Sequence, residues 1–90
     1  MHISSSDLIN LPVYTPSGQH LGRVDSLEVD IDSHAIVYYH VKTGLIKGLW
    51  HQKLIIHPSQ VISISLEKMV VEENTLEQPE AIKLATPVTK

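Results

Sequence analysis

The chain alternates apolar and polar residues in short runs. The clearest run spans residues 21–32, where Leu27 and Val29 alternate with polar neighbours. A repeat of two residues is typical of a β-strand with one buried face. Val24 breaks this alternation. The break predicts a β-bulge near Asp25, which would bend the strand as a small barrel requires.

Five further strands are expected, joined by turns rich in Pro, Gly, Asp and Ser. They cover residues 13–14, 35–41, 49–50 together with 53–57, 61–64 and 69–71. A single helical turn, capped by Ser6 or Asp7, is expected before the first strand. The pattern predicts an all-β fold, a small six-stranded antiparallel β-barrel over residues 1–72. Residues 73–90 contain two prolines and few apolar residues, so a flexible tail is expected there.

Composition narrows the possible functions. With 90 residues the chain is expected to form one domain, and its core must be aliphatic because it contains no Phe and one Trp. The net charge of −3 disfavours nucleic acid as a partner. The absence of Cys excludes disulfides and thiolate chemistry. Without a signal peptide or a long apolar run, we expect a cytoplasmic protein that does not insert into membranes.

The sequence gives little support for catalysis. No Ser lies in a pattern that would make it a nucleophile, so we expect no enzyme activity, no catalytic residue and no cofactor. Four of the six histidines are candidate metal ligands, since one possible strand register would place His40 opposite His51 and His34 opposite His57. The alternative, which we favour, is that these histidines lie at the surface and in turns.

An interaction surface has better support. Residues 42–50 are unusually apolar for a loop, and the strand before them is apolar on both faces. Tyr and Trp often carry binding energy at interfaces. Trp50 could equally plug one end of the barrel. The predicted interface residues are Tyr38, Leu45, Ile46, Leu49 and Trp50.

Several short motifs, in their order and spacing, resemble the PRC-barrel domain family. The motifs are Leu-Pro-Val-Tyr at 11–14, Ser-Gly at 17–18, Leu-Gly-Arg-Val at 21–24, Asp30, Ile-His-Pro at 56–58, Val61, Ile64 and Met-Val-Val at 69–71. The family includes the cytoplasmic part of the photosynthetic reaction-centre H subunit, the C-terminal domain of the ribosome maturation factor RimM, and small stand-alone prokaryotic proteins. This chain is most similar to the stand-alone class.

The resemblance implies a non-enzymatic six-stranded barrel that works by protein contact, often as a homodimer. We therefore expect an adaptor that binds itself and another protein. A ribosome-associated or RNA-processing factor is one alternative, by analogy with RimM, and a histidine-dependent metal-binding module is another.

Overall fold

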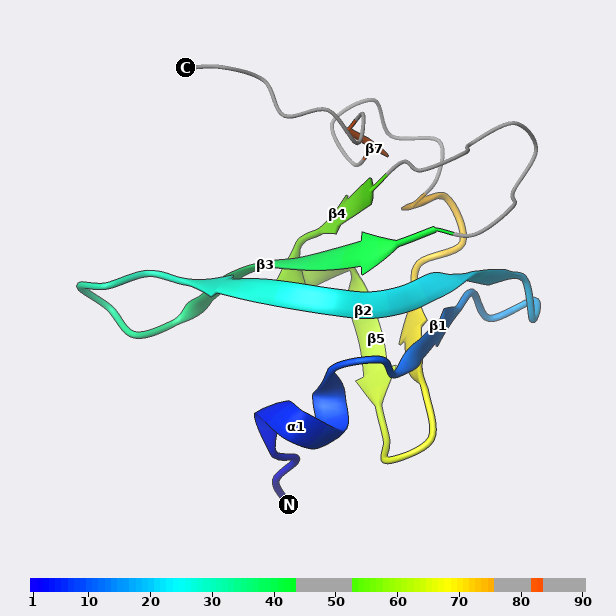
Figure 1. Ribbon diagram of the computed structural model, residues 1–90. Helices are drawn as coiled ribbons and strands as arrows, with labels where there is room; N and C mark the ends of the chain where they lie inside the picture. Colours follow the sequence, from blue (N-terminus) through cyan, green and yellow to red (C-terminus); the bar gives the residue numbers. More distant parts are fainter. Residues whose placement is uncertain (44–52, 76–81, 84–90) are drawn as a thin grey trace.

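A computed structural model describes residues 1–43, 53–75 and 82–83 of the chain. One short helix, α1 (Ser5–Leu8), precedes the strands β1 (Pro12–Tyr14), β2 (His20–Val29), β3 (Ile36–Lys42) and β4 (Lys53–Ile56). A 3₁₀ turn, η1 (Pro58–Gln60), leads to β5 (Val61–Ile64) and β6 (Met69–Val71), and β7 is Ile82–Lys83. The predicted all-β fold is confirmed (Figure 1).

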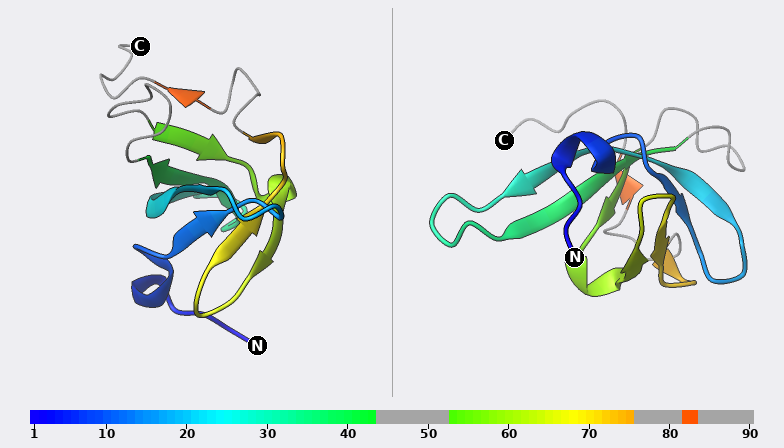
Figure 2. Two further views of the ribbon diagram at one scale, coloured as in Figure 1. Left: turned by 90° about the vertical axis from the view of Figure 1, so that its right-hand side faces the viewer. Right: turned by 90° about the horizontal axis from the view of Figure 1, so that it is seen from below.

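Within the described residues, seven strands form one sheet in the order β5-β6-β1-β2-β3-β4-β7. The 3₁₀ turn η1 connects β4, which is next to one end of this order, to β5 at the other end. Because η1 also packs near β3, the sheet curls into an open barrel-like shape (Figure 2). The orientation of one strand pair differs from the prediction, because β1 and β6 pair in parallel whereas every strand had been expected to be antiparallel. In addition to the six predicted strands, the two-residue β7 from within the expected tail pairs with β4.

The predicted bulge is present at Asp25. The register of β2 against β3 shifts between Val24 and Ser26, which stand opposite Val41 and His40. Asp25 is the extra residue on its strand. The helical turn was also predicted, although its cap is Ser4, whose hydroxyl accepts a hydrogen bond from the Asp7 backbone N–H at 3.2 Å.

The core is aliphatic, as the composition requires. Val13, Leu21 and Ile56 are completely buried, and burial raises the pKa of the Tyr39 phenol. Residues from α1 and from five strands meet in this core, so it holds the whole domain together. Its members are Leu8, Leu11, Val13, Leu21, Val24, Tyr39, Val41, Leu54, Ile56, Met69 and Val71.

Contacts with the strands continue past residue 72, where the domain had been expected to end. Glu73 accepts hydrogen bonds from the Ser17 backbone N–H and hydroxyl in the β1–β2 turn. These bonds lower the pKa of the Glu73 carboxyl. Thr75 is fully buried, and its hydroxyl donates to the Glu72 carbonyl at 2.7 Å. The chain from 73 to 75 is thus attached to the barrel.

Candidate functional site: an apolar arm on the β2–β3 hairpin

The end of the β2–β3 hairpin extends well beyond the other strands (Figures 1 and 2). We call residues 28–37 the arm. Its strands remain paired, with Glu28 opposite Tyr38 and Val29 opposite Ile36. Two-stranded ribbons are only marginally stable alone, so an arm of this kind depends on the body of the sheet, or on a partner, for its stability.

Four large apolar side chains of the arm are exposed to solvent. The exposed fraction is 88% for Ile31, 50% for Val29, 37% for Ile36 and 36% for Val37. The Leu27–Tyr39 pair still reaches the core, whereas the Val29–Ile36 pair lies beyond an irregularity in the strand register. The apolar residues of the arm therefore continue past the part of the hairpin that the core covers. Clustered exposed apolar side chains of this kind typically mark interaction sites.

The tip of the arm is acidic and has a defined turn. The Asp30 carboxylate accepts a hydrogen bond from the Ser33 backbone N–H at 2.8 Å, which lowers the pKa of Asp30. His34 adopts a left-handed conformation with φ of 67°. Asp32 lies in the same turn and adds a second carboxylate. The arm therefore combines exposed apolar side chains with negative charge at its end.

The predicted interface lies only partly within the described residues. Tyr38 is half-buried, and its ring lies 6.1 Å from that of His40 and 5.3 Å from that of His57, measured between centroids. The other predicted interface residues, Leu45, Ile46, Leu49 and Trp50, lie outside the described residues.

The strand register assumed for the candidate histidine site was wrong. His40 stands opposite Ile55 on β4, and its Nε2 lies 2.7 Å from a carboxylate oxygen of Glu28 on the neighbouring strand. His57 follows β4, and its ring contacts that of Tyr38. His34 lies in the turn of the arm and is not paired with His57. His51 lies outside the described residues. Among residues 1–43, 53–75 and 82–83, no three His, Cys, Asp or Glu side chains gather as a metal site would require.

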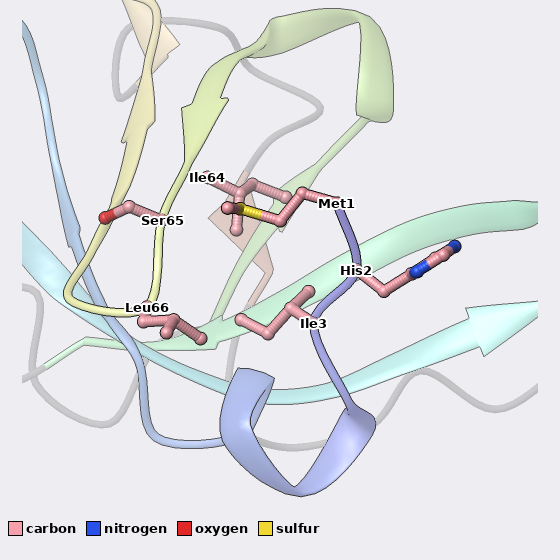
Figure 3. Close-up of a pocket in the computed structure, with 6 residues that line it drawn as sticks. All are labelled: Met1, His2, Ile3, Ile64, Ser65 and Leu66. Atoms are coloured by element: carbon pink, nitrogen blue, oxygen red, sulfur yellow. The ribbon is translucent and has the colours of Figure 1, made fainter.

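A second apolar surface lies beside the N-terminus, at the β5–β6 turn. The side chains of Met1, Ile3, Ile64 and Leu66 surround a hollow of about 260 Å³, while those of His2 and Ser65 point away from it (Figure 3). Ile62 on β5 is a further exposed apolar residue, at 56%.

The sequence predicts an interface in the loop after β3 and at Tyr38 on the strand before it, which stays a prediction, and it does not single out Val29 and Ile31 of the arm. The signal was present, because the alternation of residues 27, 29 and 31 extends to the end of the strand. Alternation alone shows which side chains share a face, but it cannot show where the core beneath that face ends.

The helices among the described residues are too short to cross a membrane. A search of curated proteins gave no match to the chain. The family model for the PRC-barrel domain matches residues 1–78, which is most of the 90-residue sequence. Together with the curled all-β sheet, this match shows that the chain belongs to the PRC-barrel domain family.

Proposed function

We propose that this PRC-barrel domain is a non-enzymatic protein-interaction module that forms a homodimer through its arm. The observation that carries this proposal is the group of four exposed apolar residues on one hairpin: Val29, Ile31, Ile36 and Val37. Their burial in a complex would be favourable by about 25 cal/mol for each Å² removed from water.

A second copy of the chain is a suitable occupant for this surface. In a two-fold dimer the same patch faces itself, so an apolar ribbon on one copy meets an equally apolar ribbon on the other. Charge selects the orientation. If two arms lay side by side in the same direction, their Asp30 and Asp32 carboxylates would repel each other. An antiparallel arrangement places the two acidic tips at opposite ends of the interface.

The dimer can be tested by sedimentation and light scattering of the full chain. We expect a mass twice the 10.1 kDa of one chain, in a concentration-dependent equilibrium. Ile31→Asp places a charge in the proposed interface, and we expect it to raise the dimer dissociation constant at least about tenfold. Because Ile31 is 88% exposed, this variant should leave the fold of the monomer intact.

Leu66→Asp is the matched control, since Leu66 is 68% exposed but lies on the β5–β6 turn. It should leave the dimer unchanged. A chain that stays monomeric at millimolar concentration would contradict the homodimer. If Leu66→Asp dissociates the dimer and Ile31→Asp does not, the interface lies at the hollow beside the N-terminus and not at the arm.

A further inference from the structure

Three basic residues from three strands form a row on one face of the sheet. Arg23 on β2 stands directly opposite Lys42 on β3, and Lys42 stands directly opposite Lys53 on β4. We call these residues the basic row. In the register of β7, Lys83 is the residue opposite Lys53. The row is unexpected in a chain whose net charge is −3.

The row is only partly neutralised by its described neighbours. The Asp25 carboxylate lies 3.2 Å from Nζ of Lys53 and 3.8 Å from Nζ of Lys42. Arg23 donates from Nη1 to the backbone carbonyl of Asn10 at 2.8 Å, and this acceptor carries no charge. Among the described residues, one carboxylate is therefore paired with two of the three cations. Like charges directly opposite each other destabilise a sheet, so an added anion would relieve this repulsion.

A depression of about 240 Å³ opens at the Arg23–Lys42 end of the row. Its lining residues include Arg23 and Lys42, whose side chains can donate hydrogen bonds to an anion. A Cβ atom at Gly22 would lie 2.3 Å from the Lys42 carbonyl oxygen, so the glycine allows β2 and β3 to approach closely there. The residues that line the depression are Asn10, His20, Gly22, Arg23, Val24, Lys42 and Thr43.

We propose that this depression binds the phosphate group of a small molecule. Because one described carboxylate lies beside the three cations of the row, a phosphate dianion would balance their remaining charge. The planar guanidinium of Arg23 can bind two phosphate oxygens at once, and the Lys42 ammonium adds a point charge beside it. The depression is smaller than the pockets of about 300–1,000 Å³ that hold drug-sized ligands. Its size therefore suits a phosphate ion or a small phosphomonoester.

This site is independent of the proposed dimer. The arm comprises residues 28–37, at one end of the β2–β3 ribbon, whereas Arg23 and Lys42 stand opposite each other at its other end. Loss of phosphate binding would leave the dimer proposal intact, and the reverse also holds.

The test is a titration of the full chain at constant ionic strength with inorganic phosphate, methyl phosphate and acetate. Binding is followed by calorimetry and by the backbone amide NMR signals of Gly22, Arg23 and Thr43. We expect both phosphates to saturate these signals at millimolar concentration and to raise Tm, because they bind the folded state. Acetate should bind at least about tenfold more weakly, since it carries one charge.

Variants of the row identify the site. Arg23→Gln and Lys42→Gln should each weaken phosphate binding about tenfold or more, because each removes a charge-assisted hydrogen bond. Lys68→Gln is the control, since Lys68 lies over the Tyr14 ring and outside the depression, and it should leave binding unchanged. The NMR spectrum of each variant shows whether it is folded. Lys42, with 68% of its side chain exposed, provides a second variant if Arg23→Gln unfolds.

Three results would overturn the assignment. The first is a linear, non-saturating response to phosphate. The second is an equal loss of binding in Lys68→Gln and the two row variants. The third is binding of an oligouridine at least tenfold tighter than methyl phosphate, which would mean that the row serves an RNA backbone.

Discussion

The two ends of the β2–β3 ribbon contain the same kinds of apolar residue but bury them very differently. Val24 and Val41, near the body, are fully buried, whereas Val29 and Ile31 in the arm are 50% and 88% exposed. Residue type cannot account for this difference. The body end lies over the other strands and α1, and the arm extends beyond them (Figure 1). Burial here is set by the length of the hairpin relative to the barrel.

The largest effect is expected from truncating a body residue. Leu21 is fully buried, so Leu21→Ala should lower the free energy of unfolding by about 2–5 kcal/mol through lost burial and a cavity. Ile31→Ala in the arm should change it by less than about 0.5 kcal/mol in the monomer. Urea unfolding of both variants, at a concentration where the chain is monomeric, measures the contrast. A cost above about 2 kcal/mol for Ile31→Ala would mean that the chain itself covers the arm.

A second comparison concerns two glycines, one in the body and one in a turn. Both have positive φ, 152° at Gly22 and 96° at Gly18, but only at Gly22 would a Cβ meet the backbone of β3. In both alanine variants the unfavourable backbone conformation should lower the free energy of unfolding by about 1–3 kcal/mol. Gly22→Ala has the added clash and should therefore show the lower Tm. Equal Tm values for the two variants would mean that the contact between β2 and β3 relaxes without cost.

A smaller, pH-dependent effect is expected where residue 73 is attached to the body. Hydrogen bonds from Ser17 lower the pKa of the Glu73 carboxyl from 4.5, so the ionised form favours folding. This contribution is fully present above pH 4.5 and is lost as the pH falls through the lower pKa of the folded state. Glu73→Gln should therefore lower Tm at pH 7 and have a diminishing effect as the pH falls below 4.5. A Tm difference that is independent of pH would contradict this origin.

The smallest effect is expected in the arm, from the contact between Glu28 and His40. The two side chains approach to 2.7 Å, but the Glu28 side chain is 57% exposed. Exposed ion pairs contribute about 0–1 kcal/mol, so Glu28→Gln should change the unfolding free energy of the monomer by less than about 1 kcal/mol. Urea unfolding at pH 7 provides the measurement. A larger loss would show that polar contacts, in addition to strand pairing, hold the arm in place.

Much of this fold could be predicted from local signals. The six main strands follow from residue alternation and from Pro and Gly in the turns, and the bulge at Asp25 follows from one break in that alternation. The parallel pairing of β1 with β6 joins segments more than fifty residues apart, which no local pattern encodes. The predicted register of β3 against β4 was also wrong. It assumed that the two strands pair symmetrically about the middle of the loop between them, but the position of a loop does not determine which residues pair. The candidate histidine pairs depended on that assumed register.

The fold class, the aliphatic core and the family resemblance could be predicted from the order of residues, because alternation and turn residues act over a few neighbouring positions. Which apolar residues remain exposed and which charges meet depends on how the strands pair and where the core ends. A net charge of −3 gave no sign of a basic surface, yet strand register brings together Arg23, Lys42 and Lys53 from distant parts of the chain. Composition is a sum over the whole chain, whereas recognition depends on where the sheet places each side chain.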